Sequence, residues 1–193
     1  MGKESRDRKK ADKVDYGVMY ESRYKLLKIA FERFLRAEPD DFEAFCEKEA
    51  DWLSDYALFM ALKDANGGNA WFSWEKDLKM RKPEALAEAR STYAKDIRFY
   101  QMLQYLFFKQ WWELKAYVNE KGIEIIGDVP IYVAGDSADV WANPEEFYLD
   151  EDFRGRTALG QSVVPLGCNE EKWIHLVDET HCGNVKALRY CPD

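Results

Sequence analysis

The chain has 193 residues, and 28 Lys and Arg against 36 Asp and Glu give it a formal net charge of −8. Hydrophobic residues make up 47% and aromatic residues 15%, which is typical of a globular protein and excludes a disordered or collagen-like chain. The negative charge argues against a nucleic-acid partner, because phosphate backbones need clustered Lys and Arg, and no apolar run is long enough to cross a membrane.

The first third of the chain predicts a charged tail followed by two amphipathic helices. Residues 1–13 are nearly all charged or small, which indicates a solvated tail. From Val14 onward apolar residues recur at steps of three and four, and Pro39 ends this first helix. The same spacing over residues 42–61 predicts a second helix, which the Asn-Gly-Gly segment at 66–68 stops.

A loop with two tryptophans separates these helices from a longer one. Trp71 and Trp74 could stack on a ligand, but packing is the better interpretation of both. Pro83 stands at a first helical position, and one helix is expected from there to about Lys121, closed by Gly122. Its apolar stripe consists of Leu86, Ala89, Tyr93, Ile97, Tyr100, Leu103, Phe107, Trp111, Leu114 and Val118.

Residues 123–133 predict a buried strand. They are rich in β-branched and aromatic residues, and Pro130 indicates a bend or bulge because it cannot donate to a ladder. A long helix, a glycine and a buried strand in succession are typical of a β/α barrel or a doubly wound sheet. Only one convincing strand is present in the sequence, so the expected sheet is incomplete.

The densest candidate chemistry lies at the carboxyl end of this strand and just after it. The candidate residues are Asp128, Tyr132, Asp136, Ser137 and Trp141. Carboxylates at this end of a barrel strand point into the mouth where substrates bind, where they can bind sugar hydroxyls while an aromatic ring stacks on a sugar face. Two alternatives stay open: Asp136 caps a short helix starting near Ser137, and Trp141 belongs to the core.

The last forty residues differ in character from the rest. From Phe153 the periodicity is weak. His175, His181, Cys182 and Cys191 fit no standard zinc spacing, so no metal site is expected. The chain also has no phosphate-binding or dinucleotide motif. Four Cys in an otherwise ordinary chain with a polar N-terminus indicate reduced thiols and a cytoplasmic location.

Several stretches of the chain resemble the 4-α-glucanotransferases, the amylomaltase or disproportionating-enzyme family. They are residues 14–17, 20–27, 55–63, 105–111, 115–133 and 136–145, and the resemblance covers about residues 14–152. The pair Trp71 and Trp74 fits the family's W-x-x-W, although Glu75 stands where proline is usual. Gly135 is a second departure, because a larger residue commonly precedes the following aspartate.

The resemblance implies a (β/α)8 barrel with helical insertions, which cleaves an α-1,4 bond in maltodextrin and passes the glucan to another sugar. It also implies that no cofactor is needed. Such a reaction is retaining and uses one carboxylate as nucleophile and another as acid/base. By the same resemblance Asp136, and after it Asp128, lie near the reacting sugar. The family's nucleophile motif V-R-I-D-H-F-R-G does not occur in these 193 residues, and the barrel strands expected before Val14 are absent as well.

The expected fold is therefore mostly α with one or two β-strands, as a partial (β/α)8 TIM-barrel fragment that carries a helical insertion. The expected division is a charged tail at 1–13, the barrel fragment at 14–152, and an out-of-frame, weakly ordered tail at 153–193. The out-of-frame tail is inferred from the codons. When the codons that can encode residues 173–193 are read one base out of frame, they permit a family-like sequence that ends at V-R-I. No catalytic residue is expected in the chain, which is predicted to be inactive alone.

Two further hypotheses stay open beside an inactive glucanotransferase fragment. One is a non-catalytic module that binds glucan or another protein through its helices, and the other is a subunit complemented by partner chains. The expected ligand is a maltodextrin or another α-1,4-glucan, with neither nucleic acid nor membrane as partner. Self-association is also expected, because the aromatic helix should expose apolar surface that an intact barrel covers.

Overall fold

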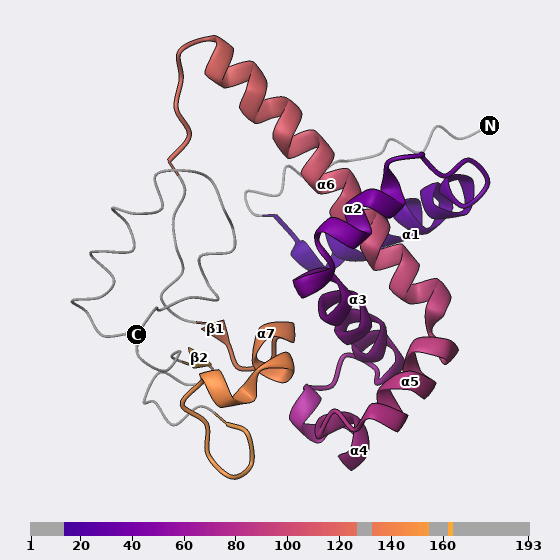
Figure 1. Cartoon of the computed structure of the whole chain (residues 1–193), viewed down its shortest axis with the longest axis vertical. Coiled ribbons are helices and arrows are strands. Elements are labelled where there is room, and N and C mark those ends of the chain that lie inside the picture. The colour runs from indigo at the N-terminus through magenta and orange to yellow at the C-terminus, as the bar shows by residue number, and fades with distance from the viewer. Residues whose placement is uncertain (1–13, 127–132, 155–161, 164–193) are drawn as a thin grey trace, which may run out of the picture. The chain divides into compact units, whose positions relative to one another are not determined.

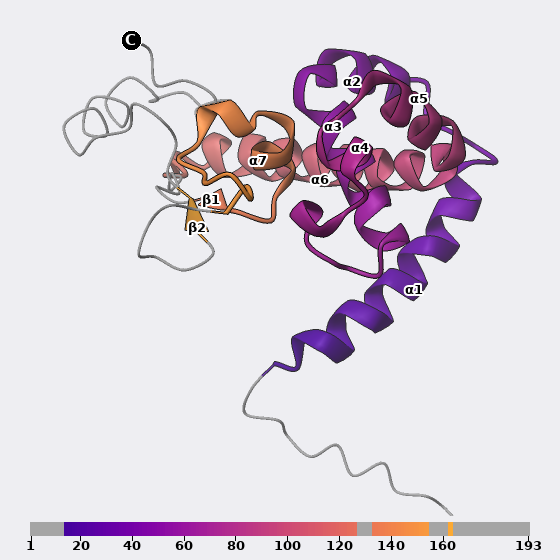
Figure 2. The ribbon, with the colours of Figure 1, turned by 90° about the horizontal axis from the view of Figure 1, so that it is seen from below.

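The computed structural model describes residues 14–126, 133–154 and 162–163, and these are mostly helical (Figure 1 and Figure 2). The elements are α1 (Tyr16–Phe34), α2 (Phe42–Lys48), α3 (Ala50–Ala65), η1 (Trp71–Ser73), α4 (Lys76–Lys79), α5 (Pro83–Thr92), α6 (Ala94–Glu120), β1 (Val133–Ala134), α7 (Ala138–Ala142), η2 (Pro144–Glu146) and β2 (Ser162–Val163). β1 and β2 pair antiparallel, with Val133 opposite Val163. The prediction of a mostly α protein with one or two strands is confirmed.

The chain divides into two compact units, Met1–Phe42 and Glu43–Asp193. In the first unit the carboxylate of Asp15 caps α1 by accepting a hydrogen bond from the amide of Val18 at 3.0 Å. The rings of Tyr20 and Tyr24, one turn apart on α1, stack with centroids 4.1 Å apart. The predicted charged tail at 1–13 lies outside the described residues.

Each of the two longer helices predicted for the second unit is in fact a pair of helices. The expected helix over 42–61 bends at Glu49, between α2 and α3, and the expected helix from Pro83 to Lys121 bends at Tyr93, between α5 and α6. Both residues leave the helical backbone region, with ψ of 11° and 21°, while their amides still donate to the carbonyl four residues earlier. Each bend therefore interrupts the regular helical backbone but not the apolar periodicity, so the sequence pattern alone does not reveal it.

The predicted helix ends are confirmed where glycine and proline set them. Pro83 begins α5. After α3 the chain turns through Gly67 and Gly68, both with positive φ, and the amide of Gly68 donates to the Lys63 carbonyl at 2.8 Å. Gly122 ends α6 in the same way, with φ of +74°. Because α3 ends at this turn, Lys63 stands in the last turn of the helix, where its side chain can reach a neighbouring element.

The core of the second unit is built around three tryptophans. Trp71 and Trp74 come from η1 and its end, and Trp141 comes from α7; all three are buried. Phe59 of α3 contacts two of these rings, with its centroid 5.3 Å from that of Trp74 and 5.8 Å from that of Trp141. The packing interpretation of Trp71 and Trp74 is confirmed. The core also contains Leu58, Leu62, Leu86, Ala89, Val140 and Phe147.

The predicted buried strand is wrong for the part of it that the structure describes before β1. Residues 123–126 form neither strand nor helix and are exposed, with Ile126 93% exposed. Residues 127–132 lie outside the described residues, and only Val133 and Ala134 form a strand. The composition is typical of a β-strand, but a buried strand needs neighbours on both sides, and no described segment lies beside 123–126 as a strand.

Helix α6 changes character along its length. Its first half contributes Phe99, Tyr100, Met102 and Tyr105 to the interior. In the second half, Phe107 and Leu114 of the predicted apolar stripe are exposed, so the expected exposure of this helix is found there. Among the described residues, no helix is long and apolar enough to cross a membrane.

Candidate functional site

The candidate site is the loop between β1 and α7. Gly135 follows β1 and is buried, and Asp136 and Ser137 come next. The hydroxyl of Ser137 accepts a hydrogen bond from the amide of Val140 at 3.4 Å, so Ser137 is the N-cap of α7. The alternative in which Asp136 caps this helix is therefore wrong, which leaves the Asp136 carboxylate available for other contacts.

Both carboxylate oxygens of Asp136 are engaged by the helical part of the unit. Lys63, in the last turn of α3, forms an ion pair with Oδ2, and the backbone amide of Trp71 donates to Oδ1 at 3.2 Å. The two side chains are 19% and 28% exposed, so this ion pair lies at the edge of the core. Each carboxylate oxygen can accept a further hydrogen bond, so the tethered Asp136 keeps capacity for a hydroxyl donor.

Trp71 holds the same loop at a second point. Its indole Nε1 donates to the carbonyl oxygen of Gly135 at 2.8 Å, and its ring is fully buried. Its backbone amide contacts the next residue, Asp136, as described above. One tryptophan therefore fixes two consecutive loop residues, and the position of the Asp136 carboxylate depends on the packing of Trp71.

Trp141 secures the other side of α7. Its ring is fully buried, and its Nε1 donates to the carbonyl oxygen of Leu78 at 3.2 Å. The guanidinium carbon of Arg81 lies 4.3 Å from the centroid of the Trp141 ring, a cation–π contact. The core interpretation of Trp141 is thus supported, since its ring presents no free face to a sugar in this structure.

Arg81 connects Trp141 to α3. Its Nη2 donates to Asp55 at 2.8 Å, and the same carboxylate oxygen lies 3.6 Å from Nη2 of Arg90. Arg81 has φ of +52°, which is uncommon for a residue with a side chain. Its Nη1 is buried and has no hydrogen-bond partner among the described residues. The uncommon backbone and the unpaired donor both cost free energy, which the ion pair with Asp55 and the contact with Trp141 offset.

Three residues of this arrangement escaped sequence reasoning: Lys63, Asp55 and Arg81. Lys63 and Asp55 stand at the two ends of the stretch 55–63, which resembles the glucanotransferase family, and the two charges flank an otherwise apolar run. That flanking is the only local signal for them. Arg81 lies in a charged loop with no distinguishing pattern.

Asp128 and Tyr132, the other two predicted site residues, lie outside the described residues. His175, His181, Cys182 and Cys191 lie outside them as well. Within the described part of the chain, no group of three or more His, Cys, Asp or Glu side chains is placed to hold a metal ion.

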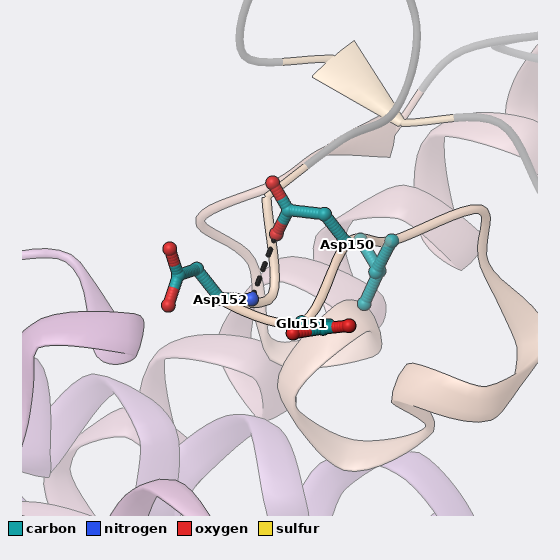
Figure 3. Close-up of a pocket in the computed structure, with 4 residues that line it drawn as sticks. Asp150, Glu151 and Asp152 are labelled. Atoms are coloured by element: carbon teal, nitrogen blue, oxygen red, sulfur yellow. Dashed lines mark hydrogen bonds between the residues drawn. The ribbon is translucent and has the colours of Figure 1, made fainter.

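A pocket of about 590 Å³ lies beside the segment that follows η2. It is lined by Leu149, Asp150, Glu151 and Asp152 (Figure 3). Oδ1 of Asp150 accepts hydrogen bonds from the amides of Asp152 at 2.9 Å and Arg154 at 2.8 Å, so this carboxylate closes the turn. Because Asp150 serves the turn and no basic group lines the pocket among the described residues, its acidic lining defines no site by itself.

Two ion pairs outside the site shift the pKa of one partner. Arg98 of α6 donates a hydrogen bond to Glu43 of α2, and this bond, supported by the positive charge, lowers the pKa of the Glu43 carboxyl. Asp77 accepts a hydrogen bond from Lys82, which with its charge raises the pKa of the Lys82 ammonium. Three of the four side chains are exposed and Arg98 is partly buried, so solvent screening keeps the contribution of both pairs to stability small.

Comparison with known proteins places this architecture in a family. The family model of the 4-alpha-glucanotransferases matches residues 1–168. A 4-alpha-glucanotransferase of Thermus thermophilus is 50% identical over 157 residues, which are 79% of this chain and 31% of that enzyme. The chloroplastic or amyloplastic enzyme of Solanum tuberosum is 36% identical over 164 residues, which are 82% of this chain and 28% of the relative.

A solved structure supports membership of the same family. The amylomaltase of Streptococcus agalactiae, in complex with acarbose, is 43% identical with a TM-score of 0.69, over 74% of this chain and 29% of that one. The chain belongs to the 4-alpha-glucanotransferase family. It spans about 30% of the length of these relatives, and the match extends on both sides of the range 14–152 quoted above.

Proposed function

We propose that this chain is part of a 4-α-glucanotransferase, which transfers α-1,4-glucan segments between maltodextrins by a retaining mechanism. The observation that carries the proposal is the tethered loop 135–137: within the stretch matched by the family, Lys63 and Trp71 hold a carboxylate at the end of a strand. Carboxylates at such a position bind substrates in barrel enzymes.

The 193-residue polypeptide by itself is proposed to be inactive. A retaining transfer needs a nucleophilic carboxylate and an acid/base carboxylate about 5–5.5 Å apart. The motif that carries the family's nucleophile does not occur among these residues. Loss of a nucleophile removes many powers of ten in rate, and binding residues do not replace it. No cofactor takes part in the proposed reaction.

The exposed residues 123–126 support a partial (β/α)8 barrel as the architecture of this chain. Strands of a parallel barrel are buried on both faces and read as continuous apolar runs. Ile123, Ile125 and Ile126 have this composition and yet are exposed. In the whole enzyme they would lie between neighbouring strands, and the helices of 43–122 would be the insertion that precedes this strand.

The predicted site residues take different parts in this proposal. Asp136 accepts sugar hydroxyls with the capacity that Lys63 and Trp71 leave free, and Ser137 sets the loop by capping α7. Trp141 supports α7 from the core. Asp128 and Tyr132 are proposed to line the same mouth on the strength of the family resemblance alone.

A self-sufficient glucan-binding module is the less favoured alternative. The three tryptophans at the candidate site, Trp71, Trp74 and Trp141, are all buried, so none of them offers an open face to a sugar ring there. Exposed aromatic rings such as Trp112 and Tyr117 lie on the second half of α6. Two measurements on the full chain separate these functions. One is an assay of glucose release from maltotriose, and the other is a tryptophan fluorescence titration with maltoheptaose, compared with a titration with cellohexaose. The proposal expects no glucose release and no saturable, linkage-specific fluorescence change. Saturable quenching by maltoheptaose alone would favour the binding module.

We retain three further proposals from the sequence. They are the division of the chain into 1–13, 14–152 and 153–193, the shifted reading frame after about Phe153, and a cytoplasmic location. Phe153 itself packs on Trp71, with centroids 5.2 Å apart, and the family match continues to residue 168. A DNA read across the codons for 150–193 tests the frame. A second frame that runs into Asp-His-Phe-Arg-Gly is expected, and its absence would refute the shift.

A further inference from the structure

The turn that ends α3 contains the one asparagine of the chain that a glycine follows, Asn66 before Gly67. Such a pair is chemically labile, because glycine has no side chain to keep its backbone nitrogen away from the preceding side-chain amide. The nitrogen of Gly67 can attack Cγ of Asn66, which closes a succinimide ring and releases Nδ2 as ammonia together with the proton of the Gly67 nitrogen. Water then opens the ring at either carbonyl and leaves aspartate or isoaspartate at position 66.

The folded turn holds the reacting atoms apart. Asn66 is half-buried, and its Nδ2 donates to the carbonyl oxygen of Leu62 at 2.8 Å. The Gly67 amide donates to the carbonyl oxygen of Asp64 at 3.1 Å, so the attacking nitrogen is occupied as well. The ψ of Asn66 is 18°, and a value near zero places the Gly67 nitrogen beside the backbone nitrogen of Asn66, turned away from its side chain. Ring closure therefore requires the last turn of α3 to open.

The contacts that keep this turn closed are local. Gly67 donates to the carbonyl of Asp64, and Gly68 donates to the carbonyl of Lys63 at 2.8 Å. A Cβ added at Gly67 or Gly68 would meet nothing within 4 Å, so no neighbouring side chain among the described residues clamps the two glycines. Helix ends are the parts of a fold that open locally with the least free energy, and the structure gives this end no further restraint.

We propose that Asn66 is a modification site: when the last turn of α3 opens, its amide converts through a succinimide to aspartate and isoaspartate, and the product loosens the hold of Lys63 on Asp136. The conversion consumes water, releases ammonia and needs no other reactant. The inference is independent of the proposed enzymatic function, because it uses only the turn after α3 and its contacts.

The product weakens the end of α3 in two ways. A carboxylate at position 66 cannot donate to Leu62, and it adds negative charge at the carboxyl end of a helix, where the backbone carbonyls already make the potential negative. Isoaspartate also inserts a methylene group into the backbone, so the hydrogen bond from Gly68 to the carbonyl of Lys63 loses its geometry. Because the ammonium of Lys63 holds Asp136, fraying of this turn reaches the candidate loop.

The same turn is linked to the tryptophans of the core. The amide of Asn69 donates to the carbonyl oxygen of Asn66 at 3.3 Å, and Nε1 of Trp74 donates to the carbonyl oxygen of Asn69 at 3.0 Å. A changed backbone at position 66 therefore also disturbs the segment that leads to Trp71, whose amide binds the second oxygen of Asp136.

Peptide mapping of the full chain tests the modification site. Trypsin cleaves after Lys63 and Lys76, so one peptide contains both Asn66 and Asn69, and Asn69 is the internal control because alanine follows it. Samples are kept at mildly alkaline pH with and without urea, and fragmentation of the peptide identifies the converted residue. We expect conversion of Asn66 in both samples, slower in the folded chain by roughly fivefold or more because the turn must first open. Asn69 should remain largely unconverted.

Urea unfolding of the aged full chain tests the consequence. The wild type and Asn66→Gln are unfolded before and after the same incubation. The midpoint of the wild type should fall in proportion to the converted fraction, whereas Asn66→Gln should keep its own starting value because its longer side chain closes a ring far more slowly. Asn66→Asp should have a lower midpoint from the outset, and the coupling between Lys63→Met and Asp136→Asn should be smaller in its background.

Three results would overturn the proposal. They are a folded chain that keeps the Asn66 amide while the unfolded chain loses it, equal rates of conversion in the folded and unfolded chains, and an aged wild type whose midpoint falls no further than that of aged Asn66→Gln. Each protein is compared with its own starting value, so the test stays valid if Asn66→Gln is less stable than the wild type.

Discussion

Lys63 and Asp136 form an ion pair across 73 residues of sequence, and this pair joins the last turn of α3 to the loop before α7. The amide of Trp71 binds the other oxygen of the same carboxylate. The candidate loop thus owes its position in part to long-range contacts at the edge of the core, which its own sequence does not reveal.

Removing one partner of this pair should destabilise the protein measurably. Lys63→Met leaves a partly buried carboxylate without its cation, and we expect a loss of about 1–2 kcal/mol in the free energy of unfolding. Asp136→Asn should cost a similar amount, and the double variant should cost less than the sum. Urea unfolding of all four proteins measures the coupling. Strictly additive losses would show that the two side chains do not interact.

We expect the indole of Trp71 to contribute more to the free energy of unfolding than the indole of an exposed tryptophan. Trp71→Phe removes the donor to Gly135 and leaves a buried carbonyl unpaired, which costs about 1–3 kcal/mol. Trp112→Phe, on the exposed side of α6, should change the unfolding free energy by less than about 0.5 kcal/mol. Equal effects of the two substitutions in urea unfolding would contradict the role given to Trp71.

Stacking of Arg81 on Trp141 predicts that charge alone is not enough at this position. Arg81→Lys keeps the positive charge but loses the planar group over the ring, and it should cost about 1 kcal/mol. Thermal unfolding by circular dichroism measures this loss. If Arg81→Lys melts like the wild type, the contact contributes nothing and α7 is held by its other contacts.

Two glycines in different backbone conformations, one in the turn after α3 and one in α1, should respond in opposite ways to substitution by alanine. Gly67 has φ of +66°, which a side chain disfavours, so Gly67→Ala should cost about 1 kcal/mol even though the space around it is open. Gly17 is the second residue of α1, and a methyl group there makes ordinary contact with Asp15, so Gly17→Ala should raise helix stability by a few tenths of a kcal/mol, less than in a helix interior. Urea midpoints decide the signs, and a stabilising Gly67→Ala would rule out the turn described here.

The contact between Glu43 and Arg98 makes part of the stability depend on pH. Because the pKa of Glu43 is lower in the folded state, the stabilisation is present above its ordinary value of 4.5 and is lost as the pH falls. Glu43→Gln should therefore lower the urea midpoint slightly at neutral pH, and the difference should shrink on acidification. Glu47→Gln on the same helix is the control. A difference that grows toward acid would contradict this assignment.

Short-range signals in the sequence were enough to predict the helix ends. Contacts between residues far apart in the sequence could not be predicted from such signals. Pro83, Gly67 and Gly122 act within a few residues, so their positions were predicted correctly. The partner of Asp136 could not be predicted, since Lys63 is brought to it only by the packing of α3 against α7. Residues 123–126 show the converse: a strand composition does not make a strand when no neighbouring strand completes the ladder.

The central claim, that this chain carries a working part of a 4-α-glucanotransferase, is tested most directly by transplantation. In the Thermus thermophilus relative, the residues that align with 14–152 of this chain are replaced by residues 14–152. Glucose release from maltotriose is measured for the chimera and for its Asp136→Ala and Trp112→Phe variants. The account predicts transfer activity in the chimera and in Trp112→Phe, and a large loss in Asp136→Ala. A folded chimera without activity, or an Asp136→Ala variant as active as its parent, would contradict it.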